Sequence, residues 1–324
     1  MNSFNTIKFD PRLRLKKMYH HSAYLFSFVA LILIAIIINP NFLTYSNLST
    51  LMLQSAIKGI IALGMTLVII SGQIDLSVGS ICALVAGLGV VVLNYTNSIP
   101  TMLLFCIVFG AILGGINGLL VTKGKIAAFI VTLATMSAYR SIIVQLGQGG
   151  PFNVSGDMFK AFRMIAAGSI FGMPNLALIF IIMTALIAAI MNHTKFGRYV
   201  YAVGSNANAA TWAGVNTDRI KLLCFTITGI LTGLSAFLLA SRLTSITAPN
   251  AGQSFELDAI AAVAIGGTAM NGGRGKIEGT FLGAIMLQMI EGILIAARIP
   301  PFLTGLVKGV IIILAVLFQS KKEK

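Results

Sequence analysis

The sequence predicts an all-α, polytopic integral membrane protein with about ten transmembrane helices and both termini in the cytoplasm. Of its 324 residues, 57% are hydrophobic and only 10% are charged, whereas about a quarter of the residues are charged in an ordinary soluble domain. A spanning helix needs roughly 20 mostly apolar residues, and runs of that order recur along nearly the whole chain. No long polar stretch separates them, which favours one membrane domain.

Ten apolar runs give the expected spans. In chain order they are residues 22–38, 51–70, 77–95, 101–122, 127–146, 174–191, 220–240, 255–269, 278–296 and 301–318. For 255–269 both a full span and a half-helix stay open. The first follows a basic segment and has no small-residue cleavage site after it, so an uncleaved signal anchor is expected. The expected organisation is a basic segment at 1–21, a transmembrane domain at 22–318 that includes a cytoplasmic loop at 192–221, and a tail at 319–324.

The distribution of basic residues orients these spans. Of the 23 lysines and arginines, 16 fall in segments that are cytoplasmic if the N-terminus is inside, and three fall within spans. The external loops hold four: Lys160, Arg163, Arg242 and Arg298. Such a positive-inside bias requires an even number of spans. The net charge of +14 is therefore an orientation signal, and nucleic acid is not expected as a partner.

The stretch from Gly72 to Ser80 interrupts two apolar runs with glycines, a carboxylate and hydroxyls where the chain turns between the second and third spans. Two interpretations remain open for Asp75 and Ser77. They are an N-cap for the third helix, whose first amides need acceptors, or a gate on a solute path. Asp75, Ser77 and Gly79 are thus candidate path residues, and the chain is a candidate transporter.

Small residues at four-residue spacing predict close helix packing, because lipid supplies no hydrophobic drive between spans. Such stripes are Gly79, Ala83 and Gly87 in the third span, Gly110, Gly114 and Gly118 in the fourth, and Gly279 and Gly283 in the ninth. The turn-plus-helix units at 72–87 and 272–287 resemble a weak internal repeat. The alternative is that small residues are simply common in membrane helices.

Uncharged polar side chains follow one face of two spans. Thr132, Thr135 and Tyr139 share a face of the fifth, and Gln288 lies on a polar face of the ninth. Hydroxyl and amide groups suit brief hydrogen bonding to a polyhydroxy solute, so these four residues are candidate path residues. Interhelical hydrogen bonding is the alternative.

Charged side chains within spans are costly and are functional candidates by default. Lys58, Arg140, Glu291 and Lys308 all lie in the outer halves of their spans, where one polar layer would join them. Glu291 and Lys308 belong to consecutive antiparallel helices at matching depth, which predicts a buried Glu291–Lys308 ion pair. Independent snorkelling of the lysines to the interface is the alternative.

The loop at 192–221 is the longest expected on the cytoplasmic side. Ser205 or Asn206 can cap a short helix that Gly214 closes, and this helix carries Trp212, the only tryptophan in the chain. Trp212 is either a docking residue for a partner or an interfacial membrane anchor. The candidate contact residues of this loop are Gly197, Arg198, Asn206, Ala207, Trp212 and Gly214.

Catalytic and metal-binding motifs are not found in the sequence. The three cysteines fall inside apolar spans, where a thiol behaves as a small hydrophobe, and they imply neither a disulfide nor a metal site. The stretch GGRGKI at 272–277 lacks the spacing and the hydroxyl of a phosphate-binding loop. The chain is therefore expected to be no enzyme, to hold no cofactor and not to hydrolyse ATP itself.

Several separated motifs resemble those of one transporter family. Residues 64–80 (GMTLVIISGQIDLSVGS) look like the signature of permease subunits of ATP-binding-cassette importers for ribose, xylose, galactose and related sugars. Residues 256–268 (ELDAIAAVAIGGT) and 272–280 (GGRGKIEGT) are similar to later motifs of that family, as are 197–199 (GRY) and 202–204 (AVG). The resemblance runs from about residue 40 to 318.

The resemblance implies a membrane subunit that pairs with a second copy or a paralogue in the bacterial inner membrane. Two cytoplasmic ATPase subunits would bind ATP and magnesium, and an external binding protein would deliver the sugar. The helix between Asn206 and Gly214 would couple to an ATPase subunit, while Asp75, Ser77 and Gly79 would shape the cytoplasmic end of the path.

A secondary transporter driven by protons or sodium is the alternative from a different class. Such proteins usually need a titratable or oxygen-rich site near the bilayer midplane, often at broken helices. The short eighth span carries Glu256 and Asp258 at its outer end and is the feature that favours this alternative. A purely structural scaffold comes third, since it would need neither the polar turn nor the elaborated loop.

Overall fold

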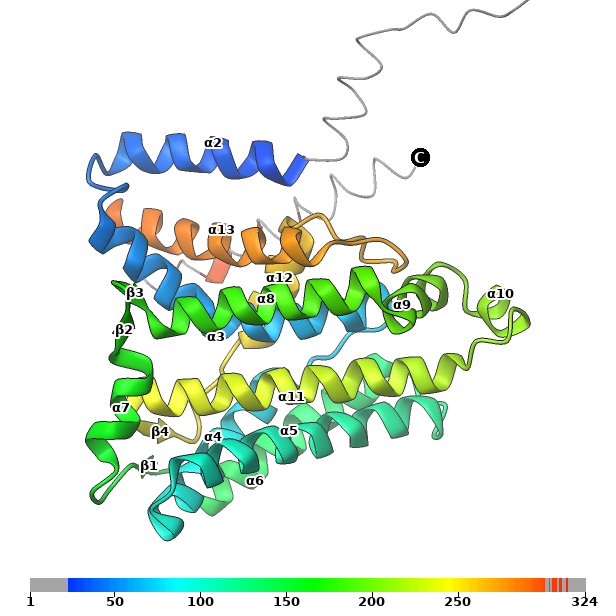
Figure 1. Ribbon diagram of the computed structural model, residues 1–324, viewed down its shortest axis with the longest axis horizontal. Helices are drawn as coiled ribbons and strands as arrows, with labels where there is room; N and C mark the ends of the chain where they lie inside the picture. Colours follow the sequence, from blue (N-terminus) through cyan, green and yellow to red (C-terminus); the bar gives the residue numbers. More distant parts are fainter. Residues whose placement is uncertain (1–22, 301–302, 304, 308, 311–312, 314–324) are drawn as a thin grey trace, which may run out of the picture.

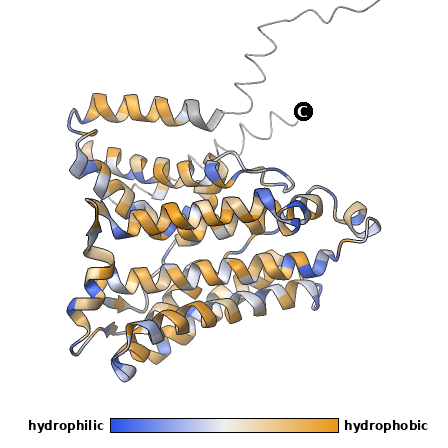
Figure 2. Cartoon of the chain, viewed as in Figure 1, coloured by the Kyte–Doolittle hydropathy of each residue, from blue (hydrophilic) through white to orange (hydrophobic). Residues whose placement is uncertain are grey.

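Long helices lying side by side make up the computed structural model, which describes residues 23–300, 303, 305–307, 309–310 and 313 (Figure 1). The helices are α2 (Ala23–Ile38), α3 (Tyr45–Ile70), α4 (Val78–Thr96), α5 (Ile99–Thr122), α6 (Ala128–Leu146), α7 (Phe159–Ala167), α8 (Asn175–His193), α9 (Lys195–Ser205), α10 (Ala207–Trp212), α11 (Thr217–Leu243), α12 (Phe255–Ile265) and α13 (Ile277–Ala296). Hydrophobic residues dominate their lengths, as Figure 2 shows.

Seven helices of the described part are long and apolar enough to cross a membrane: α3, α4, α5, α6, α8, α11 and α13. They coincide with seven of the ten expected spans, so a multi-pass membrane protein is confirmed. The expected number of ten is not. The first expected span is α2, a helix of 16 residues, which is shorter than the roughly 20 residues that a spanning helix needs. Most of the last expected span, 301–318, lies outside the described residues.

Of the two forms that the sequence left open for 255–269, a full span or a half-helix, the structure has the half-helix. α12 has 11 residues, and at about 1.5 Å per residue it covers roughly half of a hydrocarbon core about 30 Å thick. Ser254 precedes it with a left-handed backbone (φ 62°), and Gly267 follows it with φ 83°. Hydropathy does not reveal such a break, because the short helix is as apolar as a spanning one.

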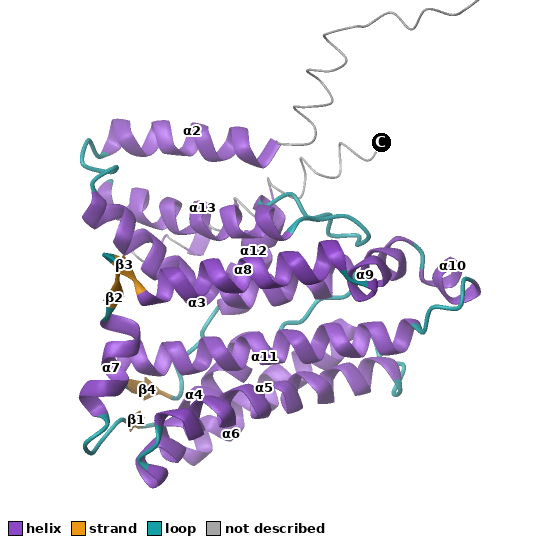
Figure 3. Ribbon diagram, in the orientation of Figure 1, coloured by secondary structure: helices purple, strands orange, loops and turns teal. Residues whose placement is uncertain are grey.

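Short strands add a small amount of β-structure to the expected all-α fold. β1 (Pro151–Asn153) pairs antiparallel with β4 (Ser245–Thr247), and β2 (Ser169–Ile170) pairs with β3 (Met173–Pro174). Both pairs lie at one end of the bundle, here called the strand end, and α10 lies at the opposite end, the α10 end (Figure 3). The two ends therefore carry different structures.

Glycine stripes bring α5 and α11 into backbone contact, as the small-residue spacing predicts. A Cβ added at Gly114 would overlap the carbonyl oxygen of Phe225 and lie 2.9 Å from the Cα of Gly229. Gly110 meets Gly229 and Gly233 in the same way. On the ninth expected span, Gly279 and Gly283 of α13 lie against the backbone of α12.

Gly114→Ala is expected to destabilise the protein by about 1–3 kcal/mol, the usual cost of overpacking, because the added methyl group meets the backbone of α11. Thermal unfolding in detergent measures the effect. Gly115→Ala on the same helix is the matched control, since its added Cβ would find only Thr226 Oγ1 at 3.6 Å. Equal stability of the two variants would contradict the packing argument.

Candidate functional site

Two non-helical segments meet where α4 and α12 begin. Residues 71–77 lead from the end of α3 to α4, and residues 248–254 lead from β4 to α12. A Cβ added at Gly79, near the start of α4, would overlap the carbonyl oxygen of Gly252 and the Oε2 of Glu256. Gly252 has φ 65°, so glycine at both positions allows the two chain segments to touch.

Asp75 lies in the first of these segments and is fully buried. Its Oδ1 accepts hydrogen bonds from the Ser77 amide (2.9 Å) and the Ser77 hydroxyl (2.6 Å), and Asn117 Nδ2 donates to Ser77 Oγ (2.7 Å). Ser77 is the N-cap residue of α4 but makes no side-chain cap hydrogen bond. Ser77 therefore occupies the predicted N-cap position, but the predicted capping hydrogen bond is not made. Its hydroxyl donates to Asp75 and accepts from no helix amide.

The predicted path residues of the fifth span lie close to this turn. Thr132 Oγ1 donates to the carbonyl oxygen of Ala128 (2.8 Å) and lies 3.5 Å from that of Ile74. Tyr139 is 7% exposed and places its hydroxyl 3.5 Å from the Leu113 carbonyl oxygen. In α6 itself, Thr135 Oγ1 donates to the Thr132 carbonyl. The structure brings Asp75, Ser77 and Thr132 together in the interior of the chain, while Gln288 lies elsewhere.

A second cluster holds three charged side chains from α3, α12 and α13. Lys58 Nζ lies 2.6 Å from Asp258 Oδ2 and 3.2 Å from Glu291 Oε1. Asp258 is 4% exposed, and Lys58 also lies 5.8 Å from the Phe255 ring centroid. This charge cluster supplies a cationic partner to Asp258, one of the two carboxylates that favoured an ion-coupled carrier.

Glu291 therefore contacts a lysine other than the one predicted. Its proposed pairing with Lys308 lies outside the described residues and stays a prediction. Arg140, expected in the same polar layer, instead donates to the carbonyl oxygens of Ala248 (3.0 Å) and Ala251 (2.6 Å). It thereby fixes the segment that leads into α12.

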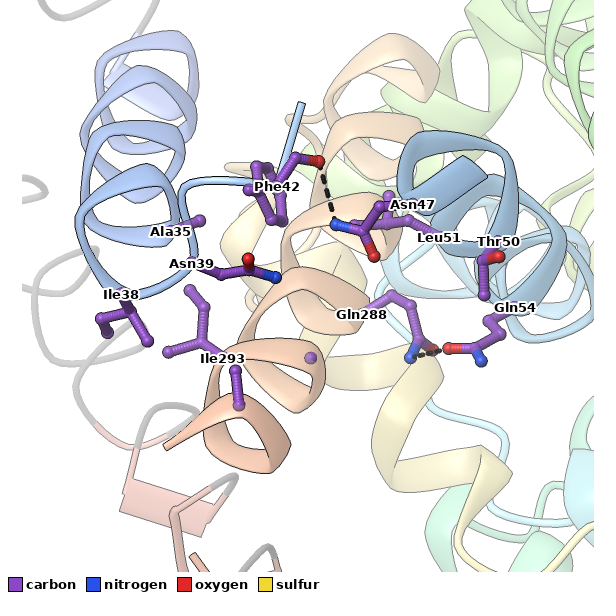
Figure 4. A pocket seen from close by; sticks show the side chains of 12 residues that line it. Ala35, Ile38, Asn39, Phe42, Asn47, Thr50, Leu51, Gln54, Gln288 and Ile293 are labelled. Carbon is purple, nitrogen blue, oxygen red and sulfur yellow. Dashed lines mark hydrogen bonds between the residues drawn. The ribbon is translucent and has the colours of Figure 1, made fainter. Parts of the chain in front are cut away.

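Gln288 belongs to a groove between α2, α3 and α13. Gln288 Nε2 donates to Gln54 Oε1 at 2.9 Å, and the two side chains face each other in Figure 4. The groove, here called the carboxamide groove, is lined by Ala35, Ile38, Asn39, Phe42, Asn47, Thr50, Leu51, Gln54, Gln288, Gly292, Ile293 and Ala296. Gln288 also lines the neighbouring pocket that contains Lys58 and Asp258.

The loop at 192–221 forms two helices where one was expected. Asn206 Oδ1 accepts from the Ala209 amide (3.0 Å), and Gly214 ends the second helix with φ 83°, so the expected short helix is confirmed as α10. Trp212 at its end is 87% exposed. The unexpected helix is α9, which the Thr194 hydroxyl caps by accepting from the Gly197 amide (3.2 Å).

α9 is built into the protein through a set of glycines, here called the glycine junction: Gly72, Gly204, Gly272 and Gly273. A Cβ added at Gly204 would overlap the Ile70 carbonyl oxygen and lie 2.7 Å from the Gly273 nitrogen. That nitrogen donates to the same Ile70 oxygen at 2.8 Å. The end of α9 therefore touches both the turn after α3 and the turn before α13.

Tyr201 adds a side-chain contact to this junction. Its hydroxyl donates to the Gly275 carbonyl at 2.9 Å. Burial raises the pKa of the Tyr201 phenol, and the charge of Glu278 raises it further, so the hydroxyl keeps its proton and remains a donor. α10 and its exposed Trp212 are thus connected, through α9, to the turn after α3 and the turn before α13.

Sequence reasoning missed Asn117, Gln54, Tyr201 and the Lys58–Asp258 contact. Asn117 lies one position before Gly118 of the predicted stripe, so its polarity on a packed helix face was an available signal. Gln54 and Lys58 follow Asn47 and Thr50 at helical spacing on α3, which is a second such signal. The pairing of Lys58 with Asp258 has none, because it joins helices far apart in the sequence.

Seven described helices that can cross a membrane, with two non-helical segments meeting between them, are the architecture of a multi-pass membrane protein. Residues 47–316 match the family of branched-chain amino acid transport system/permease components, and the chain belongs to this family. The members of this family are transport permease components, not catalytic subunits.

The relatives are curated import permeases. The chain is 41% identical over 299 residues to the ribose import permease protein RbsC of Bacillus subtilis, covering 90% of each chain. It is 39% identical over 298 residues to that of Haemophilus influenzae (91% and 92% covered) and 36% identical over 299 residues to that of Escherichia coli (90% and 92%). No solved structure is significantly similar to this chain.

Proposed function

We propose that this chain is the membrane permease subunit of an ATP-binding-cassette importer that carries a monosaccharide of the ribose type. Identities of 36–41% to ribose import permeases over about nine-tenths of both chains support the substrate class. Uncharged hydrogen-bonding groups in the carboxamide groove suit a neutral polyhydroxy solute. The observation that carries the proposal is the exposed α10, attached through α9 to the turns beside Asp75 and before α13.

The importer would contain a second permease copy or a paralogue, two ATPase subunits that bind ATP and magnesium, and a binding protein that delivers the sugar. We place the chain in a bacterial inner membrane with ten membrane segments, the termini and α10 on the cytoplasmic side and the strand end outside. The basic residues of α9 and of the start of α11, Lys195, Arg198, Arg219 and Lys221, agree with this orientation.

Mechanically, the ATPase subunits would grip Trp212 and Arg198, both exposed at the α10 end. Because α9 touches the backbone at Ile70 and Gly273, a displacement of α10 would move the turn that holds Asp75. Asp75, Ser77, Gly79, Thr132, Thr135 and Tyr139 would then act as a gate between outward- and inward-open states. All of them except the half-buried Thr135 are buried, as a closed gate would require.

Trp212→Ala is expected to abolish association of the ATPase subunits while leaving expression of the permease unchanged, because a large exposed aromatic side chain can supply about 2 kcal/mol or more at an interface. Co-purification of the ATPase with tagged permease, and ATPase activity in the purified complex, measure this. Tyr95→Ala is the control, since Tyr95 is 90% exposed at the opposite end. Normal co-purification with Trp212→Ala would contradict the docking role.

A further inference from the structure

The lining of the carboxamide groove combines neutral polar groups with an apolar wall. Its polar members are four carboxamides, Asn39, Asn47, Gln54 and Gln288, and the hydroxyl of Thr50, and none of the described residues that line it is charged. Ala35, Ile38 and Ile293 supply apolar contacts from α2 and α13. A sugar presents both hydroxyl groups and C–H faces, so both kinds of lining have a counterpart on it.

The central pair keeps hydrogen-bonding capacity. A carboxamide has two N–H donors and a carbonyl oxygen with two lone pairs, and the Gln288–Gln54 bond uses one donor of Gln288 and one lone pair of Gln54. The Gln54 amide nitrogen can still donate hydrogen bonds, and the Gln288 oxygen can still accept them. Neighbouring hydroxyl groups of a solute can donate to the oxygen and accept from the nitrogen.

The groove lies at the strand end of the bundle. Asn39 and Phe42 belong to the turn between α2 and α3, Asn47 and Thr50 to the first turns of α3, and Ala296 is the last residue of α13. Asn47, Thr50 and Gln54 follow one face of α3 at spacings of three and four residues. Polar groups therefore follow α3 from its first turns toward the charge cluster, and the pocket around that cluster shares Gln288 with the groove.

We propose that the carboxamide groove is a binding subsite for a neutral polyhydroxy solute, with Gln54 and Gln288 as its contact residues. The assignment rests on the proposed import function, because only then does the strand end face the delivered sugar. The subsite would receive the solute between the binding protein and the buried gate at Asp75. Hydrogen bonds to uncharged amides are exchanged readily for water, which allows release.

Thiol labelling of Thr50→Cys tests the site in the assembled importer. The native cysteines Cys82, Cys106 and Cys224 are buried, so a membrane-impermeant charged methanethiosulfonate would modify the introduced thiol alone. ATP-driven ribose uptake into proteoliposomes is expected to fall about tenfold after labelling, and excess ribose with its binding protein should slow the labelling. Tyr95→Cys, exposed at the same end and outside the groove, should be labelled without loss of uptake.

A double variant, Gln54→Ala with Gln288→Ala, tests the contact residues. The half-saturating concentration of loaded binding protein is expected to rise about fivefold or more, the effect of roughly one lost hydrogen bond, while ATPase stimulation at saturation is retained. Gln145→Ala is the matched control, because Gln145 is an exposed glutamine of α6 outside the groove.

The outcomes separate the subsite from the import function. The subsite proposal is overturned if uptake is unchanged after complete labelling of Thr50→Cys. It is also overturned if the half-saturating concentration of loaded binding protein is unchanged in the double variant. Either result leaves the proposed import function standing. If unlabelled wild-type complex shows no ATP-driven uptake of any monosaccharide, the proposed function itself fails, and the subsite fails with it.

Discussion

Gly204→Ala is expected to uncouple ATP hydrolysis from transport. The added methyl group would occupy the space of the Ile70 carbonyl oxygen, which accepts the Gly273 amide at 2.8 Å. α9 would have to move away from both glycine turns, and α10 with it. Coupling free energies of about 1–3 kcal/mol correspond to roughly 5–150-fold effects, so sugar uptake per ATP hydrolysed should fall about tenfold.

The ratio of uptake to ATPase activity in proteoliposomes measures this uncoupling, and it would not change if the variant merely reduced the amount of folded protein. Gly115→Ala is the matched control, because a Cβ there would make only an ordinary van der Waals contact with Thr226 Oγ1, and alanine favours a helix. Tyr201→Phe, which removes only the hydroxyl bound to Gly275, should give a smaller loss in the same ratio. A normal ratio in Gly204→Ala would show that the glycine junction does not transmit movement.

Lys58→Met is expected to have the largest effect on stability. The substitution leaves the carboxylate of Asp258, 4% exposed, without the ammonium group at 2.6 Å. Removing one partner of a buried ion pair typically costs about 3–5 kcal/mol of stability, because the other charge stays buried. Because Lys58 is partly exposed, we expect a loss of about 3 kcal/mol. Thermal unfolding in detergent and the yield of monodisperse protein measure it.

A double variant separates charge from packing at this cluster. Lys58→Met combined with Asp258→Asn should recover much of the lost stability, because the uncompensated charge is removed. Lys160→Met is the control, since Lys160 is exposed beyond the spans. If the two substitutions at the cluster add their losses, the ion pair is not what stabilises α12 against α3.

The sequence predicted the long helices well because hydropathy and length decide whether a segment crosses a membrane. Seven expected spans agree with described helices, and the caps of α10 follow from Asn206 and Gly214. The sequence could not decide between a full span and a half-helix at α12, because the break depends on the backbone at Ser254 and Gly267 (φ 62° and 83°), while its residues are as apolar as those of a full span. α9 was not predicted, because its polar and basic residues are typical of a cytoplasmic loop.

The candidate site was predictable only in part for a similar reason. Local spacing placed Thr132 and Tyr139 on one helix face, and composition singled out Asp75 and Ser77. Spatial partners are a tertiary property: Lys58 reaches Glu291 from α3, a contact that the sequence did not indicate, while the predicted pairing of Glu291 with Lys308 stays a prediction. The Gln54–Gln288 contact likewise joins residues 234 positions apart.

Uptake of labelled ribose into proteoliposomes tests the central claim most directly. The permease would be reconstituted alone and together with its ATPase subunits and binding protein. The account predicts uptake only by the complete complex, dependent on ATP at the α10 side and resistant to ionophores. Uptake by the permease alone that collapses with the ion gradient would contradict it and identify a self-powered carrier.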